Sequence, residues 1–198
     1  IRSGAAHEGG IRDLTVSTCS FFDTFGCGIT LQITGVGAME NMTFSNIVMK
    51  NVSSPISLRL GRHNYGEKID MSGPPGGMRN LMFNNIRADV IDEASLRKRI
   101  AEIYHVDLHP GEERQCISIM GIPGSPIQRV SLSNIQVTYP GGGTREDAAK
   151  RDLPELEDVY PEYFLCGVLP AYGLYARHVE SLSLDAVRFD LSAHDRRP

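Results

Sequence analysis

The chain has 198 residues, of which 41% are hydrophobic and 22% are charged, which suits one globular domain with a core of its own. The formal net charge of −4 offers no average attraction to nucleic acid or to an anionic membrane, so neither is expected as a partner. No run of about 18 apolar residues occurs, so no membrane-spanning segment is predicted.

A short phrase recurs five times along the chain. It reads apolar, two polar, apolar–polar–apolar, two small polar residues and apolar again, while the connections between copies vary in length. A constant phrase with variable connections indicates a solenoid, in which each repeat packs on its neighbours. The copies begin at Ile11, Met39, Met78, Ile127 and Val179.

Each copy predicts two short strands with a corner between them. Alternation such as Met42-Thr43-Phe44 has the period of a strand with one buried face, and a second short strand follows the polar pair. Asparagine tolerates the left-handed backbone that a sharp corner needs, and stacked asparagines can hydrogen-bond as a ladder. The predicted ladder is Asn46, Asn85 and Asn134, with Thr18 and Ala186 interrupting it in the first and last copies.

A third strand is predicted between copies, over residues 28–33, 55–60, 116–120 and 173–177. Three short strands per turn form one coil of a parallel β-helix, and five such coils would stack to roughly 24 Å. A two-sheet sandwich is the competing all-β interpretation. It is disfavoured because no Asn-Gly or Asp-Gly hairpin turn separates the strands.

The connections contain one predicted helix and two long loops. Leu96, Ile100 and Ile103 recur at helical spacing within residues 92–104, and the acidic start of that segment suits a helix N-terminus. We expect this helix to lie on the flank of the solenoid. Residues 61–77 and 138–172 are rich in Gly and Pro and predict long loops, which are often functional.

Four cysteines lack the spacing of a metal site, and no metal or other cofactor is expected. Cys19 takes the place that Ile or Val holds in the other copies, which favours a small buried side chain. A disulfide remains an alternative for these cysteines. They are Cys19, Cys27, Cys116 and Cys166.

Several segments resemble the polygalacturonase family of glycoside hydrolases. Residues 10–21, 26–31 and 39–56 are similar to the later coils of that family, and residues 139–143, 160–162 and 169–178 to the C-terminal end of bacterial members. The resemblance implies an all-β chain folded as a right-handed parallel β-helix of about five coils, with one short flanking helix and long loops. It also implies an acidic polysaccharide as the ligand, and a secreted or periplasmic parent.

The family's catalytic motifs do not occur in this sequence. Members carry Asn-Thr-Asp, Asp-Asp and Gly-His-Gly, and use carboxylates as general acid and general base. The family's later Arg-Ile-Lys falls near residues 29–32, where both cations are missing. We therefore expect residues 1–198 to form a single β-helix domain, truncated at its N-terminus, that begins after the catalytic coils.

One binding feature of the family has a counterpart here. Residues 55–65 resemble the strand and loop where members place a substrate-contacting tyrosine. Guanidinium groups suit the carboxylate of an acidic sugar, and an aromatic ring suits its face. The predicted substrate-binding residues are Arg59, Arg62, His63 and Tyr65; the alternative is a solvated loop with one packed tyrosine.

Other polar clusters offer further chemistry. His105, Asp107 and His109 would share one face if extended, as metal ligands or an acid–base pair, although an exposed loop after the helix is the simpler interpretation. His63 and Asp107 are the candidate catalytic residues. The remaining clusters are His7 beside Glu8, and Tyr160, Glu162 and Tyr163, which either line a cleft or pack a loop on the core.

Three functions are therefore compatible with the sequence. The first is a carbohydrate-active protein that binds or acts on acidic polysaccharide without the family's catalytic carboxylates. The second is a hydrolase of other chemistry, such as an esterase for small ester substrates, for which fold analogy is the only support. The third is a non-catalytic assembly module. An uncapped solenoid end exposes strand edges, so a homo-oligomer is expected.

Overall fold

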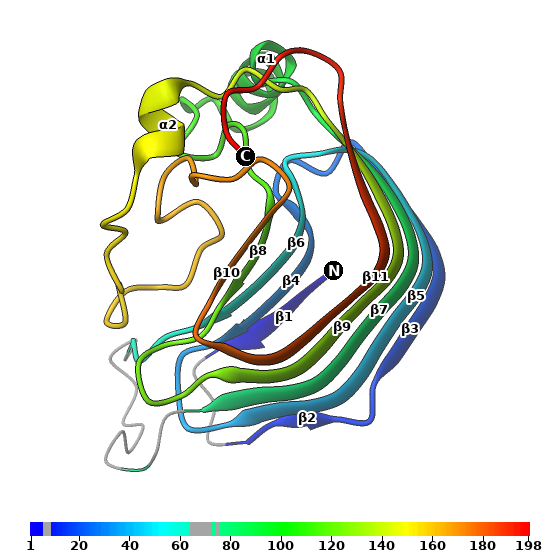
Figure 1. The fold of residues 1–198 in the computed structure, drawn as a ribbon, viewed down its shortest axis with the longest axis vertical. Helices are drawn as coiled ribbons and strands as arrows, with labels where there is room; N and C mark the ends of the chain where they lie inside the picture. The colour runs from blue at the N-terminus through cyan, green and yellow to red at the C-terminus, as the bar shows by residue number, and fades with distance from the viewer. Residues whose placement is uncertain (6–8, 64–72, 74–75) are drawn as a thin grey trace.

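The computed structural model describes residues 1–5, 9–63, 73 and 76–198, and its strands lie in two parallel sheets. One sheet, which we call sheet A, follows the order β1-β4-β6-β8-β10 (Figure 1). The four strands predicted between the repeat phrases are confirmed as β4, β6, β8 and β10 and lie side by side, whereas β1 was not predicted. Their bounds are Arg2–Ala5 for β1, Cys27–Ile33 for β4, Ser54–Leu60 for β6, Ile117–Met120 for β8 and Leu174–Arg177 for β10.

The second sheet, sheet B, holds the five repeat phrases. Its order is β11-β9-β7-β5-β2, and β3 also pairs with β5. Equivalent phrase positions stand opposite one another, so that Leu81 pairs with both Met42 and Val130. The bounds are Ile11–Arg12 for β2, Thr15–Phe22 for β3, Ala38–Val52 for β5, Gly77–Val90 for β7, Ile127–Tyr139 for β9 and Val179–Leu191 for β11.

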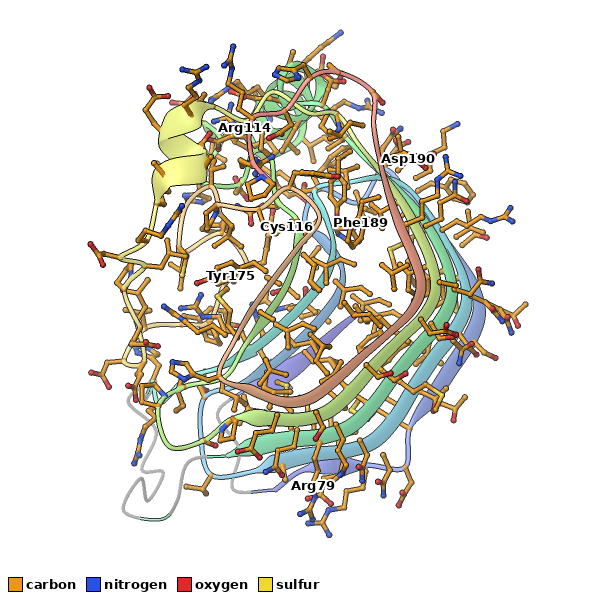
Figure 2. The ribbon with its side chains drawn as sticks, viewed as in Figure 1. Arg79, Arg114, Cys116, Tyr175, Phe189 and Asp190 are labelled. Carbon is orange, nitrogen blue, oxygen red and sulfur yellow. The ribbon has the colours of Figure 1, made fainter. Side chains whose placement is uncertain are left out.

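The pairing between these strands is parallel throughout, which rules out the antiparallel sandwich. Most apolar residues of the strands point into the space between the sheets, where Phe44 and Phe83 stack with ring centroids 5.1 Å apart. Figure 2 shows this space filled with side chains, while Arg79 and Asp190 point outward from sheet B. Burial of the apolar column is the main stabilising contribution in such a stack.

The predicted asparagine ladder is confirmed. Asn46, Asn85 and Asn134 have φ of 54°, 52° and 51°, in the left-handed region. The Asn85 amide donates to Asn46 Oδ1 at 3.0 Å, and that of Asn134 donates to Asn85 Oδ1 at 2.8 Å. Thr18 and Ala186 share the left-handed backbone at the ends of the row, where Ala186 has no amide to continue the ladder.

A second ladder, which the sequence analysis did not predict, lies at the third residue of each phrase. Asn41 donates to Asp13 Oδ1 at 2.9 Å, and Asn80 donates to Asn41 Oδ1 at 2.9 Å. Arg129 Nε then donates to Asn80 Oδ1 at 2.5 Å. These residues also have positive φ, so each long strand of sheet B turns at two left-handed residues five positions apart, and β5 turns again at Asn51.

The predicted helix is α1, Glu93–Tyr104, which begins after Asp92, whose side chain accepts from Ser95 N. Leu96 and Ile100 are buried as predicted, whereas Ile103 is 48% exposed, and the helix ends at left-handed His105. The short helix α2, Arg145–Ala149, was not predicted although Thr144 and Asp147 form a capping box. Within the described ranges, neither helix has the length and apolar content needed to cross a membrane.

The four cysteines are free, which excludes the disulfide alternative in this structure. Cys19 pairs in register with Ile47 and packs against the core, but it is only partly buried, because it lies on a strand near the end of the stack. The segment after α2 runs along the side of sheet A that faces away from sheet B (yellow to orange in Figure 1). This arrangement covers the outer face of sheet A, while no described segment crosses the outer face of sheet B in the same way.

Candidate functional site

The outward face of sheet A is polar although most of it is buried. Side chains alternate along a strand, so the residues between the inward apolar ones form cross-strand rows on the outer face. Paired positions connect Gln32 to Arg59, Arg59 to Met120 and Met120 to Arg177 in one row. The neighbouring row consists of Arg2, Thr30, Ser57, Ser118 and Tyr175.

An acidic segment, residues 152–162, crosses this face, and we call it the acidic strap. It carries five carboxylates and no Lys, Arg or His. Apart from a turn near residues 157–159, it has no regular secondary structure of its own. The acidic residues are Asp152, Glu155, Glu157, Asp158 and Glu162.

Side chains of sheet A hold the backbone of the strap. Arg177 Nη1 donates to the carbonyl of Leu153 at 2.8 Å, and Arg177 Nη2 donates to that of Pro154 at 3.0 Å. Gln32 Nε2 donates to the carbonyl of Pro161 at 2.6 Å. Because β10 and β4 lie on opposite sides of β6, the strap runs across the strands from the β10 edge toward β1.

Ion pairs hold the carboxylates of the strap at both edges of sheet A. Glu155 lies 3.4 Å from Arg177 Nη2 and 3.1 Å from His178 Nε2, beside β10. Glu162 lies 2.8 Å from Arg2 Nη2 on β1. Arg2 also donates to the hydroxyl of Tyr160 and lies over its ring, 5.2 Å from the centroid. The cations at the two edges of the face are therefore matched by carboxylates of the same chain.

A cavity of about 340 Å³ lies at the β1–β4 edge of this face. Glu112 lines it, accepting from Tyr163 Oη at 3.3 Å and from the backbone N–H of His109 at 2.8 Å. Burial, together with the nearby Glu112 charge, raises the pKa of Tyr163. The phenol therefore stays protonated and serves as a donor. Other lining residues are Arg2, Cys27, Thr30, His109 and Glu162.

Cys27 is the thiol that lines this cavity. Burial raises its pKa to about 11, and its Sγ lies 3.0 Å from the carbonyl of Ile29. The thiolate is the nucleophilic form of cysteine, and it is scarce when the pKa is far above neutral. Cys27 is therefore a partly buried thiol that is not activated as a nucleophile.

The structure places three of the four predicted substrate-binding residues at the outer face of sheet A or directly after it. Arg59 is 2% exposed, and its Nη1 lies 3.3 Å from Cys166 Sγ. The backbone N–H of Arg62 donates to the carbonyl of Glu157 at 2.6 Å, and His63 Nδ1 lies 2.7 Å from the carbonyl of Asp158. All three therefore lie beneath or beside the segment that covers the face. Tyr65 lies outside the described residues.

The other predicted site residues are more dispersed. The segment that holds Asp107 follows α1, whereas His63 follows β6 toward the opposite end of the view in Figure 1. His105 ends α1, Asp107 is exposed, and His109 stacks on Phe164 with centroids 5.2 Å apart, so these three do not form one extended face. No group of three His, Cys, Asp or Glu able to hold a metal occurs in the described ranges. His7 and Glu8 lie outside them.

Sequence reasoning missed the contribution of Arg2, Arg177 and Glu112 to this face. Arg2 and Arg177 occur on short strands more than 170 residues apart, and only the sheet order brings them to opposite edges of one surface. The cluster of acidic residues in 152–162 could have indicated that this segment contacts basic side chains. Tyr160, Glu162 and Tyr163, which were weighed as cleft residues, do contact Arg2 or line the cavity.

Comparisons with protein-family models, with curated proteins and with solved structures find no match for this chain.

Proposed function

We propose that this chain is a right-handed parallel β-helix related to the polygalacturonase family, and that it binds an acidic polysaccharide on the outer face of sheet A. Two features support the fold assignment. The chain alternates between two parallel sheets, and crossover connections between parallel strands are right-handed in nearly all proteins. The sequence resemblance covers residues from both sheets.

The observation that carries the binding proposal is the environment of Arg59. Its guanidinium is buried at the centre of the outer face, and its hydrogen-bond partner among the described residues is Cys166 Sγ. A buried cation without a counter-charge is costly, because burial removes its hydration. A sugar carboxylate would supply the counter-charge, and guanidinium binds carboxylate through paired hydrogen bonds.

The surrounding face suits the remainder of such a ligand. Arg2 and Arg177 provide charge at its two edges, and Thr30, Ser57 and Ser118 provide hydroxyls between them. This concentration of donors occurs in a chain whose net charge is −4, so the face differs from the average surface. Binding, rather than turnover, is the activity that we propose for residues 1–198.

The esterase alternative requires an activated nucleophile. Cys27 lines the cavity, but its raised pKa of about 11 leaves the thiol protonated at neutral pH. His109, which lines the same cavity, stacks on Phe164. Neither observation favours ester hydrolysis, so acidic-polysaccharide binding is the single function that we propose.

The test compares two single variants in titrations with polygalacturonate at low salt. Arg59→Met removes the central cation, and replacing a buried charge by an apolar chain of similar length is often neutral for stability. Arg79→Met removes an arginine from the outer face of sheet B and serves as the matched control. We expect Arg59→Met to weaken binding roughly 10- to 100-fold, the range of a hydrogen bond to a charged group. Equal affinity of both variants for polygalacturonate would contradict the proposal.

A further inference from the structure

We infer that the acidic strap, residues 152–162, is an internal competitor for the binding face of sheet A and must move away before an acidic polysaccharide can bind there. The inference rests on the proposed function and adds a form of regulation to it. It follows from the path, the charge and the attachments of the strap.

The path of the strap matches that of a linear ligand across the sheet. Leu153 and Pro154 contact β10, Pro161 contacts β4 and Glu162 contacts β1. Four strand spacings of about 4.8 Å separate β10 from β1, which amounts to roughly 19 Å. Seven residues reach at most about 25 Å when fully extended, so the chain from Glu155 to Glu162 is long enough to cross the sheet even with its turn near residues 157–159.

The charge of the strap resembles that of the proposed ligand. Glu155 and Glu162 place carboxylates against Arg177 and Arg2, the two cations at the edges of the face. Between them, backbone carbonyls accept from Arg62, His63 and Gln32. An acidic polysaccharide presents the same two elements, carboxylates at intervals and neutral oxygen acceptors between them.

A ligand could replace the contacts that attach the strap to sheet A. The Arg2–Glu162 pair is half exposed on the arginine side, at 51%, and exposed ion pairs contribute little to stability. The strap also leaves some hydrogen-bonding atoms of the face without partners. Gln32 Oε1 and Arg177 Nε are buried and make no hydrogen bond within the described part of the chain. A ligand with hydroxyl and carboxylate groups could supply partners for both.

The central cation of the face is not matched by the strap. Arg59 contacts Cys166, which lies beyond the strap, whereas the ion pairs of the strap involve Arg2, Arg177 and His178. The strap therefore neutralises the edges of the face and leaves its centre without a carboxylate. This difference allows a ligand that binds Arg59 to compete with the strap.

The experiment measures polygalacturonate affinity by calorimetry at low salt in three proteins. Glu155→Gln/Glu162→Gln removes both ion pairs of the strap. Glu102→Gln/Glu180→Gln, on α1 and β11, makes the same change in net charge away from sheet A. We expect the strap variant to bind roughly 3- to 20-fold more tightly than the natural sequence, because apparent affinity rises with the fraction of molecules whose face is open.

Three results would overturn the inference, and they separate it from the proposed function. Equal tightening in both double variants would show a general effect of charge. An unchanged affinity in the strap variant, with Arg59→Met still weakened, would leave the proposed function standing without a competitor. No binding to polygalacturonate by any of these proteins would overturn the proposed function together with the inference.

A second measurement reports strap displacement without mutation. A glutamate-specific protease cleaves after Glu155 and Glu157 when these residues are accessible, and the rate is normalised to an unstructured reporter peptide in the same solution. Saturating polygalacturonate should accelerate cleavage in the natural sequence, whereas dextran, a neutral polymer, should not. An unchanged rate at saturating polygalacturonate would mean that the ligand binds without moving the strap.

Discussion

The two sheets are built from one winding chain, yet their outer faces differ. Sheet B leaves its outer face open and repeats the same contacts from strand to strand, as in the Asn46–Asn85–Asn134 ladder. Sheet A buries a polar outer face under residues from a distant segment, with contacts that do not repeat. The open face is therefore stabilised by contacts that repeat between neighbouring strands, and the covered face by single contacts that do not repeat.

This difference has a physical consequence for how each face responds to change. In a stack, each repeated contact contributes separately, so the loss of one residue removes one step of the ladder. The cover of sheet A depends on a few buried groups that each hold several partners. We therefore expect the largest effects of mutation on the covered side and graded effects on the open side.

Arg197→Ala should give the largest loss of stability. The Arg197 and Asp195 side chains are 2% and 0% exposed and lie 2.8 Å apart, and Arg197 Nη1 also donates to the carbonyls of Arg114 and Leu169. Removing the cation leaves a buried carboxylate without its partner, which costs about 3–5 kcal/mol. Urea unfolding monitored by circular dichroism measures the effect. The exposed neighbour Arg196→Ala is the control and should change stability by less than about 0.5 kcal/mol.

The same pair gives this loss a pH dependence. Burial alone would raise the pKa of Asp195, but hydrogen bonds from Arg197 and Gly143 hold it below its usual value. The stabilisation is therefore present above the unfolded pKa of about 3.9 and is lost as the pH falls through the lowered folded value. The difference between Arg197→Ala and the natural sequence should shrink below about pH 4. If the stability difference between Arg197→Ala and the natural sequence did not change with pH, the lowered pKa of Asp195 would be contradicted.

Asn85→Ala should have the next largest effect, on the open face. Alanine in the left-handed region costs roughly 1–2 kcal/mol, and two ladder hydrogen bonds are lost as well, so a total of about 2–3 kcal/mol is expected. Asn84→Ala, one position before the corner, is the matched control because Asn84 has no positive φ. Equal losses of stability in Asn85→Ala and Asn84→Ala would show that the ladder position of Asn85 does not add to stability.

These two sites also mark how far the sequence predicts the structure. Asn85 belongs to a phrase that recurs five times, so its corner and its neighbours in the ladder followed from local pattern alone. The second ladder was missed because Arg129 and Ser181 interrupt its asparagine pattern. The contacts of Arg197 with the carbonyls of Arg114 and Leu169 were not predictable, since they join segments that no periodicity relates.

The candidate site shows the same division. Arg59, Arg62 and His63 were predicted from a contiguous segment, and the structure places them at or directly after one strand of sheet A. The contacts of Glu155 and Glu162 with Arg177 and Arg2 depend on the route of a long loop. Loop routes are set by tertiary contacts rather than by local propensity, which is why the sequence predicted the loop and not its path.

Ala186→Asn should increase stability by up to about 1 kcal/mol, because Asn tolerates the left-handed backbone better than Ala and adds one hydrogen bond. Ala186 has a φ of 50° and follows Asn134 in the row of corners, so a new amide could donate to Asn134 Oδ1. Thermal unfolding compares it with Asp185→Asn, which adds an amide one position away, at a residue without positive φ. A gain of the same size in Asp185→Asn would mean that the gain in Ala186→Asn does not depend on the left-handed corner or on the ladder.

Gln32→Leu should have the smallest effect, although Gln32 is 1% exposed and Asn85 lies at the surface. The substitution removes the hydrogen bond to the Pro161 carbonyl, but it also removes Oε1, a buried acceptor that has no partner within the described residues. The two contributions oppose each other, so a net change below about 1 kcal/mol is expected in urea unfolding. Protease cleavage of the strap should nevertheless become faster, since one attachment is lost. A loss above about 2 kcal/mol would be as large as that expected for Asn85→Ala. It would mean that burying the unpaired Gln32 Oε1 does not destabilise the natural sequence.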